Sequence, residues 1–86
     1  MSKIVVWSKD HCGYCTAAIN LLESYNLDIE IRKIGTGEWT REQLLEAVPT
    51  AKTVPQIIID NKIIGGYTEL RTYIEETGFN GTGYTL

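Results

Sequence analysis

The feature that most constrains this chain is the spacing of its only two cysteines, Cys12 and Cys15. Residues 3–7 before them, apolar from Ile4 to Trp7, predict a buried strand, and the spacing of apolar residues after position 16 predicts a helix. A Cys-x-x-Cys motif at such a strand-to-helix junction is typical of a dithiol redox site in a small α/β protein. The fold must therefore hold both cysteines near the start of one helix.

The length of 86 residues predicts a single domain over residues 1–86, with one modest core. The net charge is −3, and the eight Lys and Arg residues are scattered, so we expect no nucleic-acid binding. The longest apolar run has four residues, Ile4 to Trp7, whereas a membrane-spanning helix needs ~20. We therefore expect no membrane association.

We expect no signal peptide, because the first predicted strand begins at residue 3. This places the protein in the cytoplasm, where stable disulfides are rare, so the cysteine pair is expected to be redox-active or metal-binding. For the residues alone, a static disulfide or an inert reduced pair stays open. Half of a zinc site is the weakest alternative, because only His11 offers a third nitrogen or sulfur ligand.

The hydrophobic pattern predicts the order strand, helix, strand, helix, strand, strand, helix. Thr40 and Gln43 form a capping-box pattern before the second helix, and Pro49 ends that helix. The last two strands flank a tight turn and form a hairpin. In chain order the elements are expected at 3–7, 16–25, 27–32, 41–48, 56–60, 63–64 and 68–76, followed by an irregular tail at 78–86.

The predicted architecture is an α/β fold with a four-stranded mixed sheet and helices on both faces. The first two strands are expected to be parallel, because a helix joins them in a right-handed crossover. The alternation of Leu27, Ile29 and Ile31 predicts a half-buried strand at a sheet edge. Inward-facing side chains are expected at Trp7, Leu21, Leu44, Leu45, Val48, Ile57, Ile59, Leu70, Tyr73 and Ile74.

Three motifs together resemble the glutaredoxin family, and the resemblance covers residues 3–77. They are Cys12-Gly13-Tyr14-Cys15, Thr53-Val54-Pro55-Gln56 and Gly65-Gly66-Tyr67-Thr68-Glu69-Leu70. The resemblance implies a thioredoxin-like fold of the glutaredoxin type. It also implies a glutathione-disulfide oxidoreductase that serves electron transport and cell redox homeostasis. The implied partners are glutathione and disulfide-containing proteins, with ribonucleotide reductase as a family-level possibility, and we expect a monomer.

The chemistry of disulfide exchange assigns different roles to the two cysteines. Cys12 lies where the N–H groups of a helix N-terminus converge, and Lys9 adds a nearby positive charge. Such surroundings stabilise the thiolate, so Cys12 is expected to attack first and form a mixed disulfide. Cys15, in the first helical turn, is expected to resolve it. His11 is a further candidate for tuning Cys12, because imidazole changes charge near neutral pH.

The resemblance also implies a glutathione site around the cysteines. The Val54-Pro55 bond would be cis, so that the Val54 backbone could pair with an extended peptide. Lys9 would bind the glycyl carboxylate, although a plain solvated lysine is the alternative. Arg41 and Gln56 are further candidates for reaching a carboxylate. The implied glutathione-binding set is Lys9, Tyr14, Thr53, Val54, Pro55, Gly66, Tyr67, Thr68 and Glu69.

Two positions depart from the pattern of many glutaredoxins. Thr68-Glu69 stands where many members have Asp-Asp, which leaves Glu69 as the acidic group for the ligand's ammonium. Gly13 stands where many members have proline, and a glycine there resembles members that hold a [2Fe–2S] cluster between two protomers. A cluster carrier, with Cys12 as ligand in a dimer, is therefore one rival hypothesis. A glutaredoxin-like protein recharged by thioredoxin reductase is the other.

Overall fold

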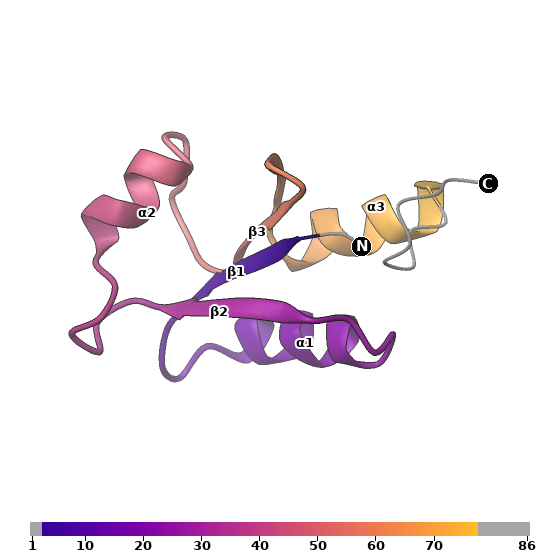
Figure 1. Ribbon diagram of the computed structural model, residues 1–86, viewed down its shortest axis with the longest axis horizontal. Helices are drawn as coiled ribbons and strands as arrows, with labels where there is room; N and C mark the ends of the chain where they lie inside the picture. The colour runs from indigo at the N-terminus through magenta and orange to yellow at the C-terminus, as the bar shows by residue number, and fades with distance from the viewer. Residues whose placement is uncertain (1–2, 78–86) are drawn as a thin grey trace.

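A four-stranded sheet forms the centre of the computed structural model, which describes residues 3–77 (Figure 1). Its strands are β1 (Ile4–Ser8), β2 (Ile29–Lys33), β3 (Gln56–Ile59) and β4 (Lys62–Gly65), in the spatial order β2-β1-β3-β4. β1 pairs parallel with β2 and antiparallel with β3, and β3 pairs antiparallel with β4. The expected mixed sheet, with the second strand at an edge, is confirmed.

Three helices cover the two faces of this sheet. They are α1 (Gly13–Glu23), α2 (Arg41–Ala47) and α3 (Tyr67–Thr77), and α2 lies on the opposite side from α1 in Figure 1. One core cluster joins α1 and α3 to the sheet, and a second joins α2 to the other face. The described elements therefore have the predicted order and architecture.

β1 is the central strand because its side chains are buried on both faces. Ile4 and Val6 belong to the core beneath α1 and α3, whereas Val5 and Trp7 belong to the core beneath α2. Continuous burial requires consecutive apolar residues rather than alternation. The strand ends at Ser8, so the chain leaves the middle of the sheet just before Cys12.

Two side chains predicted to face inward, Ile31 and Leu45, are more exposed than expected. Ile31 is 42% exposed because β2 is an edge strand, and Leu45 is 37% exposed because the short α2 buries Leu44 and Val48 instead. Tyr25 is also exposed, since α1 ends at Glu23, ahead of it. On the other face of β2, Arg32 lies over the rings of Trp7 and Trp39.

The predicted turn signals fall where the chain changes direction. Thr40 and Gln43 form a complete capping box at the start of α2. Asp60 and Asn61 have φ values of 50° and 67°, the left-handed backbone that two-residue hairpins require.

No helix within residues 3–77 is long and apolar enough to cross a bilayer. The tail predicted at 78–86 lies outside the described residues.

Candidate active site

The two cysteines lie at the N-terminus of α1 and are joined by a disulfide, with 5.2 Å between their Cα atoms. Cys12 is the N-cap residue, and its sulfur accepts a hydrogen bond from the Cys15 backbone N–H at 3.2 Å. Cys15 is 1% exposed, whereas Cys12 is only partly buried. A substrate can therefore reach Cys12 and not Cys15, which is the asymmetry expected of an attacking and a resolving cysteine.

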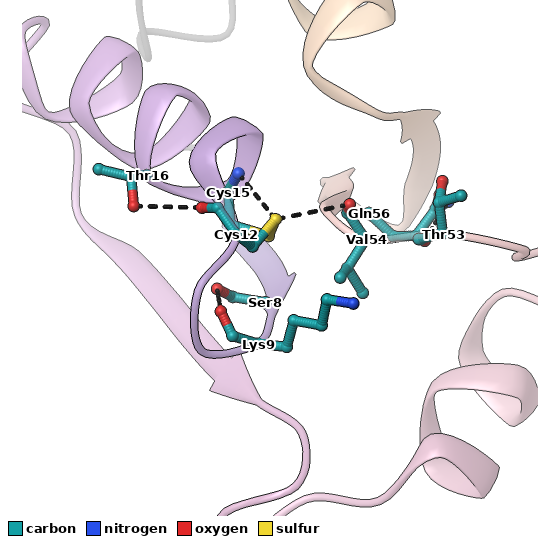
Figure 2. Close-up of a disulfide and its surroundings, with 8 residues drawn as sticks. All are labelled: Ser8, Lys9, Cys12, Cys15, Thr16, Thr53, Val54 and Gln56. Carbon is teal, nitrogen blue, oxygen red and sulfur yellow. Dashed lines mark hydrogen bonds between the residues drawn. A yellow bond between two sulfur atoms is a disulfide. The ribbon is translucent and has the colours of Figure 1, made fainter.

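The loop before β3 forms a second wall of the site. The Cys12 sulfur lies 3.7 Å from the Val54 carbonyl oxygen, as Figure 2 shows. The Val54-Pro55 bond is cis, as the family resemblance implied. The Gln56 side-chain amide donates to the Thr53 carbonyl at 2.9 Å, so Gln56 holds this loop rather than reaching into the site. Residues 42 positions apart thus meet at the reactive sulfur.

The start of α3 forms a third wall. Gly65 has a φ of +120°, and a side chain there would lie about 3.0 Å from Glu69. A Cβ on Gly66 would lie 3.6 Å from the Pro55 carbonyl, which shows how closely the second and third walls approach. The Gly66 N–H donates to the Glu69 carboxylate at 2.8 Å. Glu69 therefore caps its own helix.

The self-capping role of Glu69 is a feature that the sequence analysis missed. A glutamate three residues after the N-cap is a recognised capping pattern, and the same pattern was used correctly at Thr40 and Gln43. The residue before α3 is Gly66, which has no side chain to complete the capping box, so the pattern is less apparent there. The start of α3 thus already has an internal carboxylate as hydrogen-bond acceptor.

Two tyrosines connect the first and third walls. The rings of Tyr14 and Tyr67 lie 6.0 Å apart between centroids, with a tilt of 34°. Tyr14 is 68% exposed and Tyr67 is partly buried. The predicted residues Tyr14 and Tyr67 therefore lie together, and Tyr14 comes from the segment between the two cysteines.

A cavity of about 250 Å³ extends from the second wall toward α2. Its lining includes the predicted residues Lys9, Arg41, Thr53 and Val54, and the Lys9 side chain points toward Val54 in Figure 2. Lys52 also lines it, and the sequence analysis did not single out this residue. The only signal available was its position directly before Thr53.

His11 lines a second hollow together with Cys12, Ile31 and Lys33, and its backbone has a φ of 57°. Lys33 is paired there with Asp10 at 3.1 Å. Within residues 3–77 no group of three His, Cys, Asp or Glu side chains is placed to hold a metal ion. In the rival hypothesis of a [2Fe–2S] cluster shared by two protomers, this chain would supply only Cys12 as a ligand.

Comparison with known proteins gives one consistent family. The model of the family described as Glutaredoxin matches residues 4–64. Glutaredoxin 1 of Escherichia coli K12 is 32% identical over 84% of this chain and 92% of its own length. Mitochondrial glutaredoxin-2 of Bos taurus is 31% identical over 77% of this chain, which spans only 43% of that longer protein.

Comparison of the folded structure with solved structures finds members of the same family. The crystal structure of a buckwheat glutaredoxin–glutathione complex superposes with a TM-score of 0.72 at 26% sequence identity. The superposition covers 87% of this chain and 70% of the buckwheat chain. The neighbour's ligand is glutathione, as its description states.

Proposed function

Since this chain belongs to the glutaredoxin family, we propose that it reduces protein disulfides and glutathione mixed disulfides with electrons taken from glutathione. A Cys-x-x-Cys dithiol in this family is consistent with thiol–disulfide oxidoreduction. The observation that carries the proposal is the unequal exposure of the two sulfurs at the start of α1. An accessible Cys12 beside a Cys15 that is 1% exposed provides an attacking and a resolving thiol in one turn of helix.

The proposed reaction begins with both cysteines reduced. The Cys12 thiolate attacks one sulfur of the substrate disulfide, forms a mixed disulfide, and releases the second substrate sulfur as a thiolate. The Cys15 thiolate then attacks the Cys12 sulfur, so the Cys12–Cys15 disulfide forms and the first substrate sulfur leaves. Two glutathione thiols reduce this disulfide and become glutathione disulfide. When the substrate is a glutathione mixed disulfide, a second glutathione can replace Cys15 as the resolving thiol.

The N–H group of Cys15 is the part of the protein that favours this chemistry. It already donates to the Cys12 sulfur at 3.2 Å, and in the reduced protein the same donor faces the developing thiolate. A hydrogen bond to the charged form stabilises that form. The Val54 carbonyl, 3.7 Å from the sulfur, lies where an extended ligand backbone can pair.

We assign the proposed glutathione contacts by the three walls. The cysteinyl part would pair with the Val54 backbone, and the glycyl carboxylate would lie near Lys9. The γ-glutamyl group would lie at the start of α3, with its ammonium near Glu69. Support comes from the cavity that joins Lys9 to Val54, and from the bound glutathione of the buckwheat neighbour.

A comparison of reductants tests this function directly. We expect turnover of a small disulfide when the protein is supplied with glutathione, glutathione reductase and NADPH. We expect little turnover when thioredoxin reductase and NADPH replace them, because the site is proposed to bind the glutathione peptide. Consumption of NADPH at 340 nm measures both. Equal or faster turnover with thioredoxin reductase would contradict the proposal.

Glu69→Gln tests the proposed contact with the ligand's ammonium. The amide oxygen can still accept the Gly66 N–H, but the negative charge is lost. We expect the KM for glutathione to rise about threefold to fivefold, the range for an exposed charge pair, with unfolding stability changed little. Initial rates over a range of glutathione concentrations measure this KM.

Glu76→Gln is the matched control for that experiment, because it removes the same charge near the other end of α3. Its KM for glutathione should equal that of the unaltered protein. A lower KM in Glu69→Gln would show that Glu69 repels the ligand's carboxylate more than it attracts its ammonium, and would overturn the assignment.

The partners and compartment follow as further parts of the proposal. Disulfide-containing proteins are the proposed substrates, in a compartment such as the cytoplasm where glutathione is kept reduced. We assign no step to a [2Fe–2S] cluster, because the proposed reaction uses Cys12 as the nucleophile of disulfide exchange.

A further inference from the structure

Three cations gather in the cavity between the Val54 loop and α2. Lys9, Arg41 and Lys52 all line it, and all three are exposed. Its lining includes no Asp or Glu among the residues that the structure describes. The ion pairs found within residues 3–77 use other cations, namely Arg32, Lys33 and Arg71.

The three positive charges that line this cavity exceed the single negative charge that the glycyl carboxylate of glutathione would bring. The chain as a whole has a net charge of −3, so three cations around one cavity run against its overall charge. The glycyl carboxylate of glutathione brings a single negative charge, and Lys9 and Arg41 are enough to receive it. Lys52 remains as a surplus cation that a longer, more acidic ligand could use.

The lining of the cavity fits a peptide better than a lone anion. Ile34, Leu44, Leu45 and Ala51 supply apolar surface, and Leu45 is 37% exposed. A lining that combines apolar and cationic side chains suits an extended segment with both apolar and acidic side chains. The cavity begins at Val54, whose carbonyl lies 3.7 Å from the Cys12 sulfur, so such a segment would continue from the reacting cysteine.

The proposed glutathione contacts fix the direction of this segment. Glycine follows cysteine in glutathione and is placed at Lys9, so the residues that follow a substrate cysteine enter the same cavity. The residues that precede it lie toward the start of α3, where Glu69 is acidic. The binding surface is therefore positively charged where the residues after the substrate cysteine would lie. It has the Glu69 carboxylate where the residues before that cysteine would lie.

We propose that Lys52 selects disulfide substrates whose reacting cysteine is followed by acidic residues. The inference rests on the proposed function and names the substrate class that the site prefers. In the step concerned, the Cys12 thiolate bonds to the substrate sulfur while the substrate's own disulfide breaks and its other sulfur leaves as a thiolate. Lys52 acts by charge on the acidic residues and takes no part in the exchange itself.

Three symmetric peptide disulfides test this selection. Their monomers are acetyl-Gly-Cys-Asp-Asp-amide, acetyl-Gly-Cys-Ser-Ser-amide and acetyl-Asp-Asp-Cys-Gly-amide. The fully reduced protein is mixed with each peptide without glutathione, so that glutathione cannot occupy the binding surface. Each event converts one peptide disulfide and two protein thiols into two peptide thiols and the Cys12–Cys15 disulfide. Chromatography of the released peptide thiol gives the second-order rate constant.

We expect Lys52→Ser to slow the reaction of the Cys-Asp-Asp peptide about threefold to fivefold at low salt. The reactions of the Cys-Ser-Ser and Asp-Asp-Cys peptides should change by less than about 1.5-fold, since their contacts at Lys52 are uncharged or absent. For each peptide we take the ratio of the rate constant of Lys52→Ser to that of the unaltered protein. This ratio does not depend on the intrinsic reactivity of the peptide's thiol. Lys52→Glu should slow the Cys-Asp-Asp peptide further, and about 0.5 M salt should remove both effects.

Lys3→Ser is the matched control, because Lys3 is an exposed lysine at the opposite end of β1 from the cysteines. It changes the net charge equally and should leave all three rates unaltered. Equal slowing of all peptides by Lys52→Ser, or equal slowing by Lys3→Ser, would overturn the inference. A reduced protein that reacts with none of the peptides would instead contradict the proposed function.

Discussion

Replacing Cys12 with serine is expected to abolish glutathione-dependent disulfide reduction. The thiolate is the nucleophile of disulfide exchange, and a serine hydroxyl does not replace it. Cys15 cannot substitute, because it lies in the first turn of α1 and is only 1% exposed. The coupled assay with glutathione and glutathione reductase should fall to the rate measured without protein, both for a protein disulfide and for a glutathione mixed disulfide.

Cys15→Ser separates the two substrate classes. It should retain part of the activity on glutathione mixed disulfides, because a second glutathione can resolve the intermediate. It should lose most of the activity on protein disulfides, which depends on the dithiol. Full activity in Cys12→Ser, with folding confirmed by circular dichroism, would show that the nucleophile has been assigned wrongly.

Leu22→Ala is expected to lower the free energy of unfolding by about 2–5 kcal/mol. Leu22 is fully buried on α1, and the core cluster around it includes Val6, Ile57 and Leu70. Truncation removes apolar contacts and leaves a cavity between the helix and the sheet. Domains of this size have about 5–15 kcal/mol in total, so the loss is a large share of the stability. Urea denaturation measures this loss in the free energy of unfolding. Thermal denaturation should give a melting temperature lower by roughly 8 °C or more.

Leu45→Ala makes the same chemical change at a side chain that is 37% exposed. It should cost at most about 1.5 kcal/mol, because solvent fills the space that the side chain leaves. Equal losses in the two variants would mean that α1 is not packed on the sheet as described. A small loss in Leu22→Ala alone would mean the same.

The sequence predicted most of the fold because local patterns report burial directly. The four consecutive apolar residues from Ile4 to Trp7 predicted a strand buried on both faces, and β1 is that central strand. Thr40 with Gln43 predicted the start of α2 to the residue. The alternation in β2 predicted burial less well. It shows which side chains share a face of the strand, but not how much of that face a helix covers. Ile31 is exposed for that reason.

The site was predicted where its residues are neighbours in the sequence, and less well where they are not. The Cys12–Cys15 pair came from a short motif, and the cis Val54-Pro55 bond from the resemblance to the family that three short motifs carried. The cavity that includes Lys52 is made by segments around positions 9, 41 and 52, and only the folded chain brings them together. The positions of these basic residues along the sequence do not indicate that they line the same cavity in the folded chain.

The hydrogen bond between Gly66 and Glu69 also bears on how quickly a ligand can leave. A carboxylate that arrives at the start of α3 exchanges with an acceptor that the protein already provides. The gain in free energy is then the difference between two similar bonds, not the whole of one. Modest affinity means short residence, and under the proposed function glutathione disulfide must depart before the next oxidised substrate can enter. The self-capped helix thus suits a protein that passes electrons on rather than one that retains its ligand.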